Sequence, residues 1–287
     1  MTQEISIEVL LEKYAEEGEN TVEDVRRRVA RGLAQAEQPE QRAKWEEAFF
    51  EAQQNGFVPA GRVNSAAGLK IQATLINCFV QPVGDAISGI SNGKPGIYDA
   101  LQQAAETMRR GGGVGYDFSS IRPEGAMVKG TNSRASGPIS YMRVFDRSCE
   151  TVESAGARRG AQMGVLRCDH PDIEDFITCK TDENAITNFN ISVGVTDAFM
   201  EAVFNDMTWD LRFPDVSSNE YRGFRGTLEQ AERLGIPIRV YKTVRARDLF
   251  DKIVQQAHHN GEPGVLFLDA ANRSNPVPQL YGLEATN

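Results

Sequence analysis

A glycine-rich run between residues 109 and 125 constrains this chain more than any other stretch. Four of the five positions from Gly111 to Gly115 are glycine, and two arginines come directly before them. Glycine lets the backbone pass close to a neighbour because it has no side chain, and a guanidinium group suits a phosphate. The run therefore indicates a nucleotide, but it leaves the kind of site open.

Two common phosphate loops do not fit this run. A dinucleotide-binding fingerprint needs a glycine three residues after Gly115, where the chain has Phe118, and no Gly-Lys-Ser/Thr closes a phosphate loop of the NTPase type. The glycines also follow an expected helix, Ile97–Arg110, and precede an expected strand, Val114–Phe118, which reverses the usual strand-loop-helix order. A helix C-cap with close helix–strand packing explains them without a ligand.

Composition narrows the partners. The chain has 287 residues, a formal net charge of -9, 40% hydrophobic and 25% charged residues. This balance is ordinary for a globular protein, and it argues against a surface that coats nucleic acid, so free nucleotides are the better partners. No apolar run approaches the roughly 20 residues of a membrane span, and the N-terminus lacks a signal-peptide core. We expect a cytoplasmic protein without nucleic-acid or membrane partners.

The four cysteines and three histidines do not form a metal-binding pattern. No Cys-x-x-Cys pair occurs, and the histidines do not complete a zinc site. His170 lies among acidic residues, which could be read as a ligand cluster. The simpler interpretation is a helix start, with Pro171 at the first helical position and acids in the first turn. We therefore expect no metal.

The organisation of the chain changes near residue 56. Residues 1–56 form an expected helical region, and residues 57–287 alternate short β-rich runs with helices, which is typical of a parallel sheet covered by helices. The expected helices before residue 56 are Ser6–Glu17, Thr21–Ala36 and Gln41–Gln54. The expected strands are Ile71–Val80, Val114–Phe118, Gly164–Cys168, Asn188–Val195 and Gly264–Leu268, and Met207–Tyr241 is expected to be a hairpin-like insertion.

Several unusual segments follow one another in a fixed order. They are Asn77–Val80, Asp85, the glycine-rich run to Arg122, Ala135–Pro138, Gly156–Gly164, Asp169–Ile173, Asn188–Val193, Gly261–Gly264 and Asn272–Pro276. In this order and spacing, residues 57–287 resemble the catalytic large subunit of ribonucleotide reductases, most closely the adenosylcobalamin-dependent class II. The resemblance implies an α/β fold, the first half of a ten-stranded barrel with about five parallel strands, preceded by the small helical region.

The resemblance also implies roles for individual residues. Cys78 corresponds to one cysteine of the pair that reduces the 2′-carbon of the ribonucleotide substrate. The alternative is that Cys78 is a buried strand cysteine with a purely structural role. Asn77, Gly160 and Ala161 correspond to substrate-binding positions. An external reductant of the thioredoxin type would then restore the cysteine pair.

A deoxynucleoside triphosphate effector, or ATP, is a further implied ligand. Asp85, Arg122 and Lys129 correspond to positions that contact the effector base, sugar and phosphates; two cations suit the phosphates, and a carboxylate accepts hydrogen bonds from a base or sugar. Arg158 and Arg159 would lie between effector and substrate. Two ordinary surface turns are the alternative.

The last residues resemble the approach to the family's finger loop, whose motif is Asn-x-Cys-x-Glu. Asn287 corresponds to the asparagine of this motif, so the radical cysteine and the second half of the barrel would belong to a C-terminal remainder. We therefore expect the isolated chain to be inactive and the complete enzyme to be a homodimer. A split gene, an intein junction or a truncation would each explain this endpoint.

Three alternatives stay open on sequence alone. The protein could belong to the diiron-partnered class I, or the chain could be a non-catalytic module that binds a deoxynucleotide effector. The sequence also leaves diphosphate and triphosphate substrates undecided, with diphosphates preferred.

Overall fold

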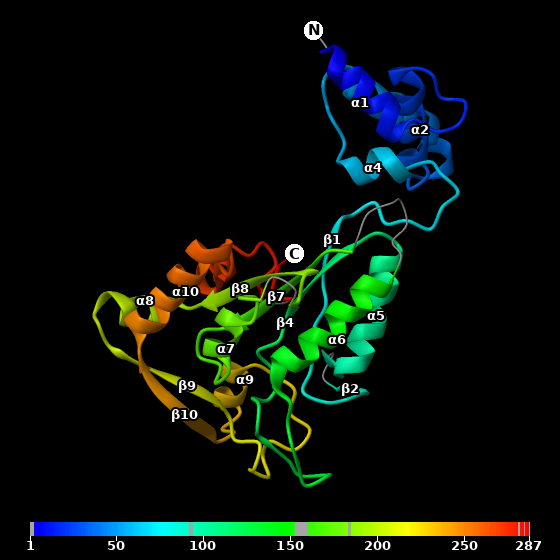
Figure 1. Ribbon diagram of the computed structural model, residues 1–287. Helices are drawn as coiled ribbons and strands as arrows, with labels where there is room; N and C mark the ends of the chain where they lie inside the picture. Colours follow the sequence, from blue (N-terminus) through cyan, green and yellow to red (C-terminus); the bar gives the residue numbers. More distant parts are fainter. Residues whose placement is uncertain are drawn as a thin grey trace. The chain divides into compact units, whose positions relative to one another are not determined.

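The chain divides into two compact units in the computed structural model, Met1–Asn77 and Cys78–Asn287 (Figure 1). The structure describes residues 3–91, 94–152, 160–182, 185–280, 282–283 and 285–286. The boundary between the two units thus lies between Asn77 and Cys78, further along the chain than residue 56, where the sequence pattern changes.

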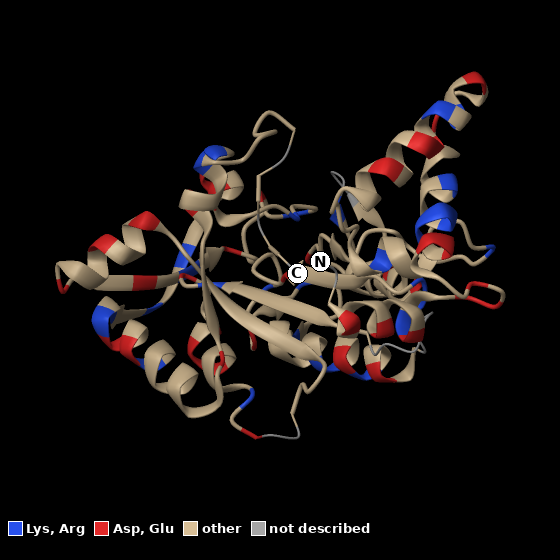
Figure 2. Ribbon diagram, turned by 90° about the horizontal axis from the view of Figure 1, so that it is seen from above, with Lys and Arg blue, Asp and Glu red and all other residues tan. Residues whose placement is uncertain are grey.

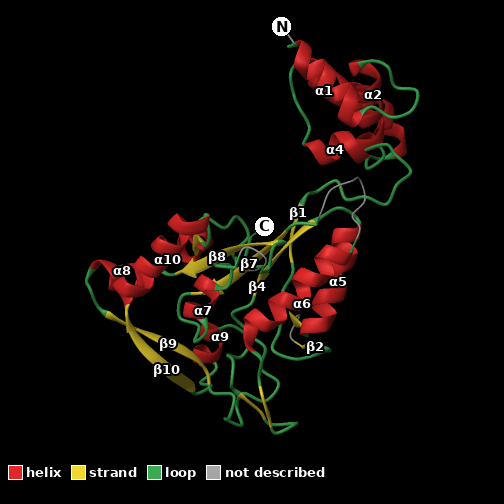
Figure 3. Cartoon of the chain, viewed as in Figure 1, coloured by secondary structure: helices red, strands yellow, loops and turns green. Residues whose placement is uncertain are grey.

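The first unit consists of helices and loops (Figure 3). Its elements are α1 (Glu4–Tyr14), α2 (Val22–Ala34), the 3₁₀ helix η1 (Pro39–Gln41), α3 (Arg42–Gln54) and α4 (Gly61–Ala66). The side chain of Thr21 accepts a hydrogen bond from the backbone N–H of Asp24, and the Asp24 carboxylate accepts the backbone N–H of Thr21, which forms a capping box at the start of α2. The three predicted helices are present; α1 begins two residues earlier and ends three residues earlier than expected, α2 is three residues shorter, and α3 is one residue shorter.

Contacts of α2 explain why residues 57–77 belong to this unit. Arg28 donates hydrogen bonds to the carbonyl oxygens of Ala67 and Asn64, at 2.7 and 3.1 Å, and to Glu19 at 2.8 Å. A Cβ on Gly32 would lie 2.3 Å from the backbone nitrogen of Gly68, so the two backbones are in close contact. The segment around α4 is therefore fixed to α2.

A five-stranded parallel sheet forms the centre of the second unit (Figure 1). Its strand order is β1 (Cys78–Val80), β4 (Gly113–Asp117), β7 (Gln162–Arg167), β8 (Phe189–Val195) and β11 (Gly264–Phe267). All four pairings are parallel, and strands that are neighbours in this order also follow one another along the chain. The predicted α/β fold with five parallel strands is confirmed.

The first strand is shorter than predicted. Pairing begins at Cys78 with Gly113, and no ladder includes residues 71–77. The partner strand β4 starts directly after the turn that ends the preceding helix, so it offers residues 71–77 no backbone groups to pair with.

Helices connect and cover the strands. They are α5 (Ile97–Arg109), α6 (Gly137–Thr151), α7 (Ile173–Thr178), α8 (Asp197–Phe204), α10 (Ala246–Asn260) and α11 (Leu268–Arg273). The rings of Tyr116 in β4 and Phe145 in α6 meet edge to face, with centroids 4.9 Å apart, and Phe189 of β8 joins the same buried cluster. This aromatic contact fastens α6 to the centre of the sheet.

The glycine-rich run is a helix end followed by a strand. Gly111 has a φ of +90° and donates its N–H to the carbonyl of Met108, while Gly112 donates to the carbonyl of Thr107. These two bonds form a Schellman motif at the end of α5. A Cβ on Gly112 would lie 2.7 Å from the ring of Phe79, so close packing of helix and strand excludes a side chain here. The interpretation of these glycines as a helix C-cap with close helix–strand packing is confirmed.

The insertion between α8 and α10 contains an antiparallel hairpin. Strand β9 (Thr208–Pro214) pairs with β10 (Ile238–Arg245), and α9 (Leu228–Arg233) lies between them in sequence. A separate small core includes Phe213 and Tyr221 of the insertion together with Ala126, which follows β4. The predicted hairpin-like insertion is confirmed, and it reaches four residues beyond Tyr241.

Two further strand pairs complete the described elements. Strand β2 (Ile90–Ser91) pairs with β3 (Lys94–Pro95), and β5 (Met127–Val128) pairs with β6 (Ser133–Arg134).

Both signs of charge alternate along the helices, whereas the sheet strands are mainly uncharged (Figure 2). Within the described ranges, no helix is long and apolar enough to cross a membrane.

Candidate functional site

The segment that leaves β4 is tied to the neighbouring strand. Ser119 donates its backbone N–H to Asp117 at 2.9 Å, and its hydroxyl oxygen accepts the backbone N–H of Arg167 at 2.9 Å. Arg167 in turn contacts Asp169 at 2.9 Å, and the pair is largely buried. These contacts fix the direction in which residues 119–124 leave the sheet.

His170 also contacts the segment 119–124, through the carbonyl of Ile121. Its Nδ1 accepts the backbone N–H of Asp172 at 3.0 Å, so Nε2 carries the proton and donates to the carbonyl of Ile121 at 2.9 Å. Burial lowers the pKa of His170 to about 4, so the ring stays neutral near pH 7. Among the residues that the structure describes, no group of three or more His, Cys, Asp or Glu side chains could bind a metal ion. His170 is a structural hydrogen-bonding residue.

The expected helix start after His170 needs a correction. Helix α7 begins at Ile173 with Asp172 as its N-cap, so Pro171 precedes the helix and does not occupy its first position. The hydrogen bond from Asp172 to the His170 ring holds the preceding residues in a turn. The acids of the first turn are present as predicted, at Glu174 and Asp175.

Asp85 and Arg122 form the centre of the candidate site. Arg122 donates its backbone N–H and its Nε to the two carboxylate oxygens of Asp85, at 3.1 and 2.8 Å. The hydroxyl of Tyr221 also donates to Asp85, and the Arg122 guanidinium lies 5.7 Å from the Tyr221 ring centroid. Burial and the nearby Asp85 carboxylate raise the pKa of Tyr221 well above its usual value, so its hydroxyl keeps the proton that it donates. A charged pair and an aromatic ring therefore hold one another in place.

Lys129 reaches the same cavity as this pair. Its ammonium group donates to the carbonyl of Ser218 at 3.3 Å. Asp85, Arg122 and Lys129 all line a cavity of about 540 Å³, together with Arg222 from the insertion. The structure thus brings the three predicted effector residues together, and the cavity has an excess of cations.

A second cavity adjoins the first and is more apolar. It measures about 390 Å³ and shares Asp85 and Arg122 with the larger one. Ile97 of α5 and Tyr141 of α6 contribute to its wall, and Arg134 also lines it. A ligand with one apolar part and one anionic part would match the two adjoining spaces.

Cys78 begins the edge strand β1. Of the four cysteines, all within the described residues, Cys78 alone is exposed. Burial raises the pKa of Cys149 to about 11 and of Cys179 to about 12, and it also raises the pKa of the fully buried Cys168. Since a thiolate is the reactive form, the three other cysteines are poorly suited to redox exchange.

The predicted substrate positions lie at the starts of the strands. Asn77 is exposed and directly precedes Cys78, and Ala161 is exposed just before β7. The carbonyl of Ala161 accepts the N–H of Val114, which connects it to the start of β4. A Cβ on Gly160 would lie 2.7 Å from the sulfur of Cys149, so this position has little space for a side chain. Cys78, Gly160 and Ala161 are therefore at the amino-terminal edge of the sheet.

Three of the predicted site residues lie outside the described residues. They are Arg158, Arg159 and Asn287.

Sequence reasoning missed the contribution of the insertion to the site. Tyr221, Arg222 and Arg225 line the larger cavity, and Arg134 lines the smaller one. The available signal was the alternation of aromatic, basic and glycine residues from 221 to 225, which is unusual inside a hairpin insertion.

The two units match two domains of one enzyme family. Residues 76–287 match the barrel domain of ribonucleotide reductases, and residues 1–72 match their all-alpha domain. The chain belongs to the ribonucleotide reductase large-subunit family.

Individual relatives are similar to this chain over most of its length. A vitamin B12-dependent ribonucleoside-diphosphate reductase of Mycobacterium tuberculosis is 38% identical over 265 residues, which are 91% of this chain and 34% of the relative. An enzyme of the same description from Thermoplasma acidophilum is 38% identical over 232 residues, 80% of this chain and 26% of the relative. A ribonucleoside-diphosphate reductase subunit alpha of Chlamydia trachomatis is 28% identical over 257 residues, 85% of this chain and 24% of the relative. The chain spans about a quarter to a third of the length of these relatives.

Proposed function

We propose that the complete protein containing this chain reduces ribonucleotides, preferably diphosphates, to 2′-deoxyribonucleotides by thiyl-radical chemistry. Membership of the reductase family supports this proposal, and so do the names of the relatives, which are ribonucleoside-diphosphate reductases. The single structural observation that carries it is the exposed Cys78 at the start of an edge strand of the parallel sheet.

Cys78 acts as one thiol of the reducing pair. The 2′-hydroxyl of the substrate leaves as water, and the two electrons come from two thiols that become a disulfide. The chain spans about a quarter to a third of its relatives' length, and we assign the partner cysteine and the radical cysteine to other parts of the complete reductase. Asn77, Gly160 and Ala161 contact the substrate at the same edge of the sheet, and a reductant of the thioredoxin type restores both thiols.

Replacement of Cys78 tests this role in the complete reductase. Cys78→Ser should abolish multiple turnover, because serine cannot form the disulfide, while binding of the substrate continues. Cys179→Ala is the matched control, since its thiol is half-buried with a pKa raised to about 12, and it should retain multiple turnover. Unchanged multiple turnover in Cys78→Ser would overturn the assignment.

Adenosylcobalamin is the cofactor that we propose for radical generation. The two B12-dependent relatives are 38% identical to this chain, and the subunit alpha of C. trachomatis is 28% identical, which favours class II over class I. The cofactor would supply the initiating radical. Activity with adenosylcobalamin and no second subunit is the expected result, whereas activity that requires a radical-generating partner subunit would establish class I.

A deoxynucleoside triphosphate is the proposed effector, and ATP can take the same position. The apolar cavity suits the base, and the cationic cavity beside it suits the phosphates, with Arg122 and Lys129 as donors. Asp85 accepts a hydrogen bond from the sugar or base. Arg158 and Arg159 relay the identity of the effector to the substrate pocket.

Equilibrium binding of dTTP to the complete reductase tests the effector site. Lys129→Ala should weaken binding about tenfold, because it removes one charge-assisted hydrogen bond and its only described polar contact is to a carbonyl. Arg122→Ala should abolish binding, although it also removes the partner of Asp85. Arg239→Ala removes an exposed guanidinium of the same insertion outside both cavities and serves as the control. Equal affinity in Lys129→Ala and Arg239→Ala would contradict the proposal.

The complete enzyme is proposed to be a homodimer. The smaller effector cavity opens beside α5 and α6, through Ile97 and Tyr141. An interface formed by these two helices would let the second subunit close the effector site. Sedimentation of the complete protein with and without dTTP would measure this association.

A further inference from the structure

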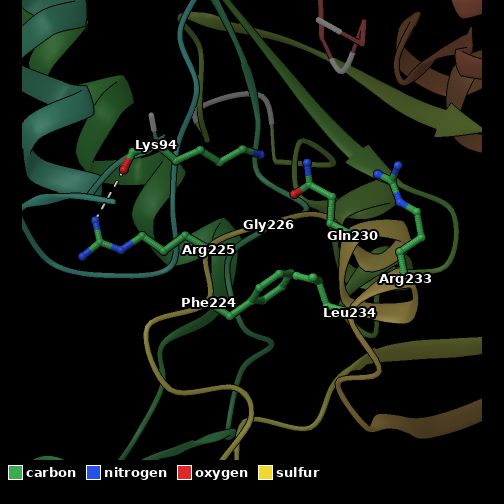
Figure 4. A pocket seen from close by; sticks show the side chains of 7 residues that line it. All are labelled: Lys94, Phe224, Arg225, Gly226, Gln230, Arg233 and Leu234. Atoms are coloured by element: carbon green, nitrogen blue, oxygen red, sulfur yellow. Dashed lines mark hydrogen bonds between the residues drawn. The ribbon is translucent and has the colours of Figure 1, made fainter. Parts of the chain in front are cut away.

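A third cavity lies on the other side of the segment Phe224–Arg225. It measures about 410 Å³, and its lining includes Lys94, Arg225 and Arg233; none of the described residues that line it is an aspartate or glutamate. Phe224 and Leu234 give it an apolar wall (Figure 4). We call it the Lys94–Arg233 cavity. The three cations give the described wall of the cavity a positive potential.

The acids beside Arg233 on α9 do not neutralise its charge. Glu229 and Glu232 lie on α9 beside Arg233, but Glu229 pairs with Arg167 at 2.5 Å, and Glu232 pairs with Arg212 at 2.7 Å. Among the described residues, Arg233 has no carboxylate partner, and its one recorded side-chain hydrogen bond uses Nε and the carbonyl of Glu229. Its terminal nitrogens remain available to a ligand.

The donors of the cavity are held in place. Arg225 donates to the carbonyls of Gly89, Ser88 and Lys94, and the bond to Lys94 is drawn in Figure 4. The ammonium group of Lys94 points into the cavity in the same view and donates to the Ser120 hydroxyl at 3.3 Å. The backbone and the side chain of Lys94 are therefore both anchored before any ligand arrives.

Gln230 contributes a further donor. Its Oε1 accepts the backbone N–H of Thr227 at 3.0 Å as part of a capping box, which leaves the amide N–H₂ group for the cavity. No acceptor within the described ranges takes that group. A Cβ on Gly226 would lie 2.3 Å from Gln230 Oε1 and 2.6 Å from the Phe224 ring, so the absence of a side chain there keeps the cavity open.

We infer that the Lys94–Arg233 cavity is a second anion site, which binds the phosphates of a nucleotide-sized ligand between Lys94, Gln230 and Arg233. All three groups donate hydrogen bonds, and two of them carry a positive charge, as phosphate recognition requires. The ring of Phe224 and the side chain of Leu234 receive the base. This site is separate from Asp85 and Lys129, and it does not rest on the proposed function.

Footprinting of Lys94 tests the site directly. The complete reductase is acetylated with an amine-reactive ester, with increasing ATP or inorganic tripolyphosphate, and modification of Lys94 is measured by mass spectrometry. Both compounds should slow the acetylation of Lys94. ATP should act at about a threefold lower concentration than tripolyphosphate, because its base buries apolar surface against Leu234. Lack of protection at millimolar concentrations of both would overturn the inference.

Matched variants assign the protection to this cavity. Arg233→Ala should raise the protecting concentration of both compounds about tenfold, since one charge-assisted hydrogen bond is lost. Arg239→Ala removes an equally exposed guanidinium of the insertion from outside the cavity and should leave protection unchanged. Equal effects of these two variants would reduce the result to general surface charge and refute the site.

Two more variants distinguish the base contact and the effector site. Leu234→Asn should remove the preference for ATP over tripolyphosphate, and a preserved preference would contradict the base position. Arg122→Ala should leave protection of Lys94 intact, because Arg122 does not line this cavity. Loss of protection in Arg122→Ala would show that the phosphate occupies the effector site instead.

Discussion

Gly137 and Gly125 offer a matched pair of perturbations in the candidate site. Both have a φ of +75°, so alanine at either position costs about 1–2 kcal/mol for a left-handed backbone. A Cβ on Gly125 meets nothing within 4 Å, whereas a Cβ on Gly137 would lie 2.8 Å from Asp172 Oδ2 and 3.0 Å from the backbone nitrogen of Glu124. Overpacking adds about 1–3 kcal/mol. We expect a loss of about 1–2 kcal/mol for Gly125→Ala and about 2–5 kcal/mol for Gly137→Ala.

Urea unfolding of the 287-residue chain measures this difference through Trp209, with Trp45→Phe in every sample. Trp209 reports on the second unit, because its indole N–H donates to the carbonyl of Cys168 at 3.1 Å. With a slope of about 3 kcal/mol per molar urea, the midpoint should fall by about 0.3–0.7 M for Gly125→Ala and by about 0.7–1.7 M for Gly137→Ala. Equal losses would refute the claim that contact with Asp172 and Glu124 limits the space at Gly137.

Three further perturbations address charge and hydrogen bonding. Burial raises the pKa of Asp172 to about 6 from its ordinary 3.8, so the folded state keeps this proton to a higher pH than the unfolded state does. The contribution of Asp172 to stability therefore falls as the pH rises from about 4 to 6. Asp172→Asn should remove this fall, measured as the free energy of unfolding against pH. Arg28→Lys should destabilise the first unit by about 2 kcal/mol, because an ammonium cannot replace a guanidinium that contacts Glu19 and three carbonyl oxygens. Trp45 fluorescence would follow the unfolding of this unit. Tyr221→Phe should weaken dTTP binding to the complete reductase about tenfold by removing a donor from Asp85, and unchanged binding would show that the carboxylate does not need this support.

Local patterns in the sequence were sufficient to predict the sheet. Apolar runs flanked by glycine and capping residues marked four of the five strands to within two residues. Three of these four, β4, β7 and β8, are mainly buried, as is typical of parallel strands that are covered on both faces. The exception was the first strand, whose apolar residues from Ile71 onward resemble a strand but are exposed. Its start is fixed by the position of Gly113 on the neighbouring strand, and a single segment does not encode where its partner begins.

The candidate site was only partly accessible from sequence. Asp85, Arg122 and Lys129 were predicted only through the resemblance to ribonucleotide reductases, and the structure brings them to one cavity. Tyr221 is 136 residues from Asp85 in sequence, and its hydroxyl reaches the carboxylate only because the insertion folds back over the sheet. Such a contact has no local pattern, since neither residue predicts the other.

The insertion connects the cavities of the second unit through a few adjacent residues. Tyr221 is buried in the small core with Phe213, and its ring also contacts Phe224. Phe224 and Arg225 line both the larger cavity, which we propose for the effector phosphates, and the Lys94–Arg233 cavity. A ligand that fixes either side chain changes the wall of the other space, and any effect on affinity must then be reciprocal between the two ligands. Tyr221, which donates to Asp85, thus contacts Phe224, a residue through which the two proposed anion sites can influence one another.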